Sequence, residues 1–182
     1  MKKYEEEKEK SILTWRNYQI GDNIEEALER INTHFLFLNE EEIMKFVRYR
    51  TIGNLQGKYL IVGEQYGPKL KLPLIPFGNN MPGLKLFEAI DKSNLRWDEV
   101  IITNAFKPIE DSRQALLDEI DLPGVESIIC LGNNASPEVL SVLKMNKIDK
   151  KVHKLPHPSS SFVYRGESIE SYADKINQIT EE

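Results

Sequence analysis

The chain has 182 residues, of which 40% are hydrophobic and 29% are charged, and its formal net charge is −5. These values are typical of one globular domain with a sizeable core, to which a small extension can be added. No apolar run approaches the roughly 20 residues that span a bilayer. No apolar stretch follows the charged start, so we do not expect a secretory signal. We expect a cytoplasmic location. The acidic balance argues against a protein that grips long duplex DNA with its whole surface.

The single cysteine, Cys130, leaves this chain without an intramolecular disulfide and without a cysteine-ligated metal or iron–sulfur centre. Cys130 lies in the apolar run Ile128–Leu131, so we expect a buried, inert thiol rather than a nucleophile. The sequence predicts no metal and no other cofactor.

The N-terminal part of the chain is expected to be a tail followed by helices. Residues 1–10 are highly charged, and apolar side chains recur at helical spacing from Asp22 to about Arg50, with a second helix starting near Asn39. We expect residues 1–56 to pack on, or to cap, an α/β domain formed by residues 57–182, so that the whole chain makes one compact unit.

From Lys58 onward, short apolar runs alternate with helical patterns. The expected strands are Tyr59–Val62, Val100–Thr103, Ser127–Leu131 and Lys151–Leu155. The expected helices cover about 82–91, 111–120, 136–144 and 169–179. Fully apolar strands separated by helices are typical of a parallel sheet with helices on both faces. The sequence therefore predicts a three-layer α/β/α sandwich around a central, mainly parallel four-stranded sheet.

Three polar turns directly follow predicted strands, beginning at Gly63, Asn104 and Pro156. Ligands of open α/β sheets bind outside the carboxyl ends of the strands, so these turns should converge. The last turn contains His157-Pro158-Ser159, which can offer an imidazole to developing negative charge and hydroxyl or NH groups to a phosphate. A local basic rim is expected around this turn from Lys144, Lys147, Lys150, Lys151, Lys154 and Arg165.

In order and type, these turns resemble the motifs of the uracil-DNA glycosylase superfamily. Gly63-Glu64-Gln65-Tyr66-Gly67-Pro68 resembles the first motif in its Gly-Glu-x-x-Gly version, and His157-Pro158-Ser159 resembles the second. Val163-Tyr164-Arg165-Gly166 follows at the spacing of the best-known branch. The resemblance extends from about Lys58 to Gly166 and implies the fold of that superfamily.

Two further positions are carried over from the same resemblance. Phe77, in Ile75-Pro76-Phe77-Gly78, stands where members place an aromatic ring that stacks on the extruded base. Asn104, in Ile102-Thr103-Asn104-Ala105-Phe106, stands where members read the Watson–Crick edge of uracil.

The resemblance implies hydrolysis of the bond between deoxyribose and uracil, or a modified pyrimidine, in DNA. The reaction passes through an oxocarbenium-like sugar while negative charge moves onto the departing base. Glu64 is then expected to orient water and to stabilise the sugar cation, and His157 to donate a hydrogen bond to the base oxygen. Phe77 would stack on the base and the Asn104 amide would read its edge. The remaining expected substrate contacts are Gly63, Gln65, Tyr66, Ser159 and Arg165.

The sequence departs from the family pattern at several positions. Gln65 replaces the aspartate that activates water in the best-known branch, and Tyr66 occupies a position that is commonly proline. Members of the Gly-Glu type often hold an iron–sulfur cluster with four cysteines, which this chain does not have. Ser160 and Ser161 replace the usual Pro-Leu, whose leucine wedges into the duplex, and Phe162 is the candidate replacement wedge. A single-stranded or already unpaired substrate is favoured.

Other interpretations remain open. The same site could bind a nucleotide or nucleobase, or DNA, without cleaving it, or the fold could be a protein-interaction module that uses its N-terminal helices. Each proposed residue also has an ordinary structural alternative: Glu64 as a surface carboxylate, Phe77 as core, Asn104 as a turn cap and His157 as a structural histidine. The expected partner is DNA or a free nucleotide, and association with a membrane is not expected.

Overall fold

The computed structural model describes residues 52–53, 56–65, 76–77, 81–107 and 112–181. The helices expected between Asp22 and Arg50 lie outside these ranges. Within the described part of the chain, no helix combines the length and the apolar character needed to cross a bilayer.

The centre of the molecule is a five-stranded sheet in the order β1-β3-β2-β4-β5. Its strands are β1 (Ile52–Gly53), β2 (Tyr59–Gln65), β3 (Val100–Phe106), β4 (Ser127–Leu131) and β5 (Lys151–Leu155). Strands β2 to β5 are all parallel, which confirms the predicted sheet. Strand β1 adds a short antiparallel edge against β3, and two residues are too few to produce a recognisable pattern.

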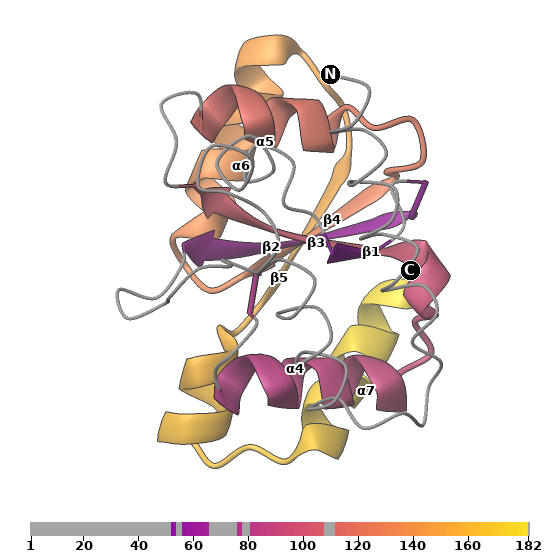
Figure 1. The fold of residues 1–182 in the computed structure, drawn as a ribbon, viewed down its shortest axis with the longest axis vertical. Coiled ribbons are helices and arrows are strands. Elements are labelled where there is room, and N and C mark those ends of the chain that lie inside the picture. The colour runs from indigo at the N-terminus through magenta and orange to yellow at the C-terminus, as the bar shows by residue number, and fades with distance from the viewer. Residues whose placement is uncertain (1–51, 54–55, 66–75, 78–80, 108–111, 182) are drawn as a thin grey trace, which may run out of the picture.

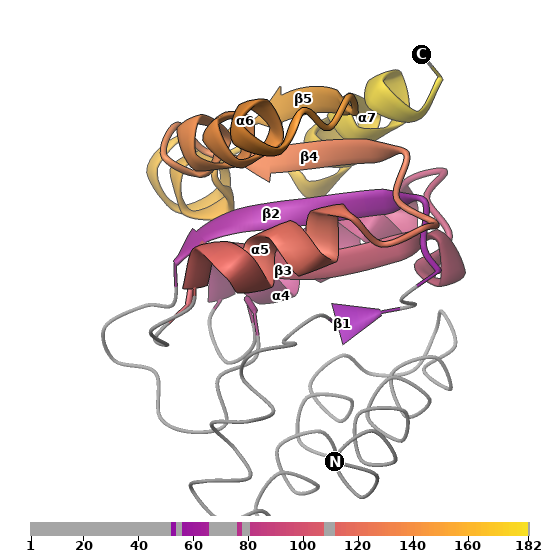
Figure 2. The ribbon, with the colours of Figure 1, turned by 90° about the horizontal axis from the view of Figure 1, so that it is seen from above.

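Helices cover both faces of the sheet. They are α4 (Met81–Lys92), α5 (Ser112–Ile120), α6 (Ala135–Asn146) and α7 (Ile169–Thr180). Helices α4 and α7 lie on one face, and α5 and α6 lie on the other (Figure 1). Seen from above, the parallel strands run side by side between the two pairs (Figure 2). The three-layer sandwich is confirmed, with two short additions: a 3-10 turn, η1 (Trp97–Glu99), and a π-helical turn, η2 (Ser159–Tyr164).

Each face of the sheet has its own buried cluster, because successive side chains of a strand point to opposite faces. Ile61, Ile102 and Ile129 pack beneath α4 and α7, while Leu60 and Ile128 pack beneath α5 and α6. Strands buried on both faces must be apolar at nearly every position, which is why their sequences read as unbroken hydrophobic runs.

Cys130 lies in this core and is fully buried, as predicted. Burial raises the pKa of its thiol to about 12, against a small opposing effect of Lys154. The reactive thiolate is therefore scarce at neutral pH, which makes the thiol inert.

Candidate active site

The segments expected to form the first two turns meet at Gly63. Both begin as strand rather than as turns, because β2 continues to Gln65 and β3 continues to Phe106. The register of β2 and β3 places Gly63 beside Asn104. A Cβ added at Gly63 would lie 2.3 Å from Asn104 Oδ1 and 2.3 Å from Phe77 Cζ. Because glycine has no side chain, the amide and the ring can both approach the β2 backbone there. Asn104 is 2% exposed and Phe77 is 8% exposed, so both side chains are held in the protein rather than in solvent.

Phe77 has an unusual backbone. Its φ is 61°, in the left-handed region that non-glycine residues rarely adopt. The Phe77 backbone packs closely against helix α4, because a Cβ at Gly83 would lie 1.7 Å from the Phe77 carbonyl oxygen. The ring also belongs to the core cluster beneath α4. A conformation of this kind costs roughly 1–3 kcal/mol and tends to occur at ligand-binding positions.

The third turn brings His157 to the same place. The rings of His157 and Phe77 are tilted by 40° with their centroids 6.1 Å apart. Gly132, which directly follows β4, has a φ of 90°, and a Cβ there would lie 3.1 Å from His157 Cβ. The Gly132 NH donates a hydrogen bond of 2.8 Å to the Leu155 carbonyl. The turn after β4 therefore supports the turn after β5.

The hydrogen bonding of His157 defines its neutral tautomer. The backbone NH of Ser159 donates to His157 Nδ1 at 3.1 Å. An accepting Nδ1 carries no proton, so the proton of the neutral ring is on Nε2. Partial burial lowers the pKa of His157 below its usual value, and the nearby charge of Glu64 opposes this shift. The ring is therefore a neutral Nε2–H donor at pH 7.

We expect protonation of His157 to reduce stability on the acid side. The folded-state pKa lies below the ordinary value of 6.5, so the unfolded chain binds this proton more strongly. The free energy of unfolding should therefore decrease as the pH falls through 6.5 towards the folded-state pKa. Urea unfolding of the protein and of His157→Gln between about pH 5 and pH 8 measures this contribution, which should be missing in the variant. An NMR titration that places the His157 pKa above 6.5 would contradict it.

The residues of the first motif, Glu64 and Gln65, differ in how far their side chains are buried. Glu64 is half-buried near the end of β2, and its charge acts on His157, so the carboxylate lies on the same side of the molecule as the imidazole. Gln65 ends the strand, is exposed and pairs with Phe106. Tyr66 lies outside the described residues.

The segment after His157 is a π-helical turn rather than an irregular loop. The NH of Ser161 donates to the His157 carbonyl at 3.0 Å, and Phe162 is only 5% exposed. The Phe162 ring packs on Tyr172 of α7 with a centroid distance of 4.9 Å. The expectation that Phe162 is an apolar wedge is therefore wrong, because its side chain is part of the core. The exposed apolar residues of this turn are Val163, at 57%, and Tyr164, at 84%.

Tyr172 also anchors the histidine turn, because its hydroxyl donates to the Pro156 carbonyl at 2.6 Å. Ser159 is half-buried at the start of η2 and Arg165 is exposed just after it. A phosphate contact from Ser159 or Arg165 stays a prediction.

The basic rim predicted around His157 is wrong for most of its members. Lys151 pairs with Ser127 at the amino end of the sheet, which is the edge opposite to the site. Lys150 donates to the Val125 carbonyl near the same edge, and Lys144 and Lys147 lie at the end of the preceding helix. Residues close in sequence to the histidine are thus separated from it by the length of β5.

The sequence interpretation overlooked two supporting glycines, Gly83 and Gly132. Gly132 carried a usable signal, because it directly follows an apolar run in the sequence, as Gly63 does. Gly83 carried none, because its neighbour Phe77 is brought to it only by the fold. Within the described ranges, no group of three or more His, Cys, Asp or Glu side chains is arranged to hold a metal ion.

Comparisons with known proteins find both a solved structure and a family model that resemble this chain. Wild-type SMUG2 of Pedobacter heparinus has a similar solved structure, with 16% sequence identity and a TM-score of 0.49 over 69% of this chain and 75% of that chain. A comparison with curated protein sequences finds no significant match. The family model of the uracil DNA glycosylase superfamily matches residues 51–181, which include every described strand and helix. The chain therefore belongs to the uracil DNA glycosylase superfamily.

Proposed function

We propose that this protein hydrolyses the N-glycosidic bond of uracil, or of a modified pyrimidine, in DNA. The observation that supports this best is that Asn104 and Phe77 both approach the bare backbone of Gly63, while His157 lies beside the Phe77 ring. These residues come from three separate segments of the chain, and together they offer the π-face, the paired donor and acceptor, and the NH donor that a pyrimidine requires.

The proposed chemistry assigns one task to each side chain. Phe77 stacks on the extruded base and the Asn104 amide reads its edge. His157 donates from Nε2 to the base oxygen as negative charge builds there, and its neutral state suits a donor that keeps its proton. Glu64 orients the attacking water and stabilises the cationic sugar. Water adds its hydroxyl to the sugar carbon and supplies the proton that the departing base takes up.

A second function is favoured by one specific residue. Gln65 stands where the best-known branch has its water-activating aspartate, and an amide cannot act as that base. The alternative is a protein that binds a nucleotide, nucleobase or DNA at the same site without cleaving it.

A substrate panel tests the two functions against each other. Labelled oligonucleotides carrying uracil or modified pyrimidines, single-stranded and double-stranded, are incubated with the protein and with the double variant Glu64→Ala/His157→Ala. We expect free base from the single-stranded uracil substrate with the natural chain and none with the double variant. No release, together with a large thermal shift on adding a free nucleotide, would favour the binding protein.

We expect Tyr164 to contact a base that flanks the target. It is 84% exposed and lies on η2, the turn that follows His157. Stacking on an aromatic ring contributes about 1–3 kcal/mol per base, so Tyr164→Ala should raise KM for single-stranded substrate about tenfold, with kcat little changed.

Two variants control this measurement. Tyr164→Phe keeps the ring and should bind normally. Met145→Ala removes another exposed apolar side chain, 65% exposed on α6, and should have no effect. An unchanged KM for Tyr164→Ala would contradict the assignment.

A further inference from the structure

A buried ion pair lies directly behind Asn104, between β3 and α5. Lys107 Nζ is 2.8 Å from Glu119 Oε2, and the two side chains are 0% and 4% exposed. Lys107 Nζ also donates to the backbone carbonyl of Asn104 at 2.8 Å. Thr103 donates its hydroxyl to the same Glu119 oxygen at 2.9 Å. One carboxylate and one ammonium group thus hold two consecutive residues of the strand end.

Stability alone does not account for this pair. Removing two charges from water costs several kcal/mol per ion, and apolar residues of similar volume often replace such pairs without loss. Among the described residues, Glu119 Oε1 has no hydrogen-bond partner, so the carboxylate is only half satisfied. Burial raises the pKa of Glu119, because a charge removed from water is costly, although the Lys107 ammonium group opposes the shift.

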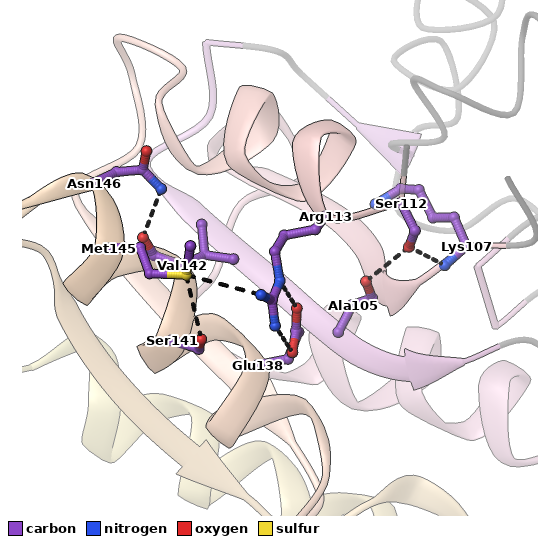
Figure 3. Close-up of polar contacts among 9 residues, drawn as sticks. All are labelled: Ala105, Lys107, Ser112, Arg113, Glu138, Ser141, Val142, Met145 and Asn146. Atoms are coloured by element: carbon purple, nitrogen blue, oxygen red, sulfur yellow. Dashed lines mark hydrogen bonds and ion pairs between the residues drawn. The ribbon is translucent and has the colours of Figure 1, made fainter. Parts of the chain in front are cut away.

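The surroundings tie down the end of β3 as well. The NH of Lys107 donates to Ser112 Oγ at 2.8 Å, and the same hydroxyl reaches the Ala105 carbonyl at 3.4 Å (Figure 3). Ser112 begins α5, the helix that also supplies Glu119. The strand end is therefore connected to one helix through both its backbone and the Lys107 side chain.

We propose that Lys107 and Glu119 are positioning residues that fix the Asn104 peptide and so set the selectivity for the base. This inference rests on the proposed function, in which the Asn104 amide reads the base edge. Reading that edge requires the amide to be held within about 0.5 Å and 10–20° of its working geometry. The Lys107 ammonium group donates to the backbone carbonyl of Asn104 from the face of the sheet opposite to Phe77. Without that hydrogen bond the Asn104 backbone is held less firmly, and its side-chain amide gains freedom to rotate.

The matched control is a second ion pair on the same helix. Arg113 of α5 donates to both carboxylate oxygens of Glu138 on α6, at 2.6 and 2.9 Å (Figure 3). Arg113 is 54% exposed, and among the described residues its side chain contacts Glu138 and Met145 of α6 rather than β3. Exposed pairs contribute little, so its loss should leave the site intact.

The test compares Lys107→Met/Glu119→Gln with Arg113→Met/Glu138→Gln. Two quantities are measured: the NMR signals of the Asn104 side-chain amide without substrate, and the ratio of kcat/KM for uracil to that for cytosine. In the Lys107/Glu119 variant we expect shifted or broadened Asn104 amide signals, a fall in kcat/KM for uracil of about tenfold to 10²-fold, and a reduced ratio. The Arg113/Glu138 variant should match the natural chain.

The amide signals separate this inference from the proposed function. If the natural chain releases no base, the proposed function fails, while the Asn104 signals still test the positioning role. Unchanged signals in a folded Lys107→Met/Glu119→Gln variant would overturn the inference. If that variant does not fold, Lys107→Arg keeps the charge but not the compact ammonium group, and it must perturb the Asn104 signals for the inference to stand.

Discussion

Replacing His157 with asparagine is expected to lower the rate constant of base release by about 10²–10³-fold, the usual cost of removing one donor from a charge-stabilising site. The structure gives the physical reason. The Ser159 NH occupies Nδ1, so Nε2 is the nitrogen that carries the proton in the neutral ring. A donor that acts on charge developing in the transition state should affect kcat more than KM. Single-turnover release from a uracil oligonucleotide measures the change.

His153→Asn is the control for this prediction. It makes the same chemical change in β5, at a residue paired with Ile129 two positions before the strand ends. It should release base at nearly the natural rate. A loss of less than tenfold in His157→Asn would show that the imidazole does not stabilise the departing base.

Gly63→Ala is expected to lower kcat/KM by at least about 10²-fold, because a misplacement of about 1 Å at a reacting site has this effect. The added methyl group would lie 2.3 Å from Asn104 Oδ1 and from Phe77 Cζ, so both side chains must move. The amide that reads the base and the ring that stacks on it are displaced together. The same oligonucleotide assay measures the loss, and circular dichroism shows whether the fold is kept.

A double variant separates steric displacement from general damage. In an Asn104→Ala background the collision of the new methyl group with the amide is gone. Gly63→Ala should therefore destabilise the Asn104→Ala protein less than it destabilises the natural chain, as measured by urea unfolding. Equal destabilisation in both backgrounds, or full activity of Gly63→Ala, would show that the close approach of Asn104 to Gly63 has no role.

Much of the fold could be predicted because parallel strands leave a strong signal. Tyr59–Val62 and Ser127–Leu131 are buried on both faces, so nearly every position had to be apolar. The helices were recognised within one or two residues of their ends for α4 and α7. The edge strand β1 was missed because a pair of residues has no periodicity.

The candidate site could be predicted in part, because Asn104 lies near the carboxyl end of β3 and His157 lies just beyond that of β5, and these ends share one edge of the sheet. Phe77, Asn104 and His157 do lie together, although their roles stay predictions. Phe162 and the lysines before His157 were interpreted wrongly, because neighbours in sequence need not face the same way. The Phe162 side chain, in the turn that follows the histidine, points into the core, and Lys150 and Lys151 lie at the opposite edge.

The sequence by itself determined the layered architecture and the order of the three turns, since both depend on local runs of apolar residues and on the glycine, asparagine and proline that end them. Only the tertiary structure decided which side chains touch. The contact between Gly63 and Asn104, the left-handed Phe77 beneath α4 and the Lys107–Glu119 pair behind β3 all join residues that are not adjacent in the chain. Such contacts depend on strand register and helix placement, which no local pattern encodes.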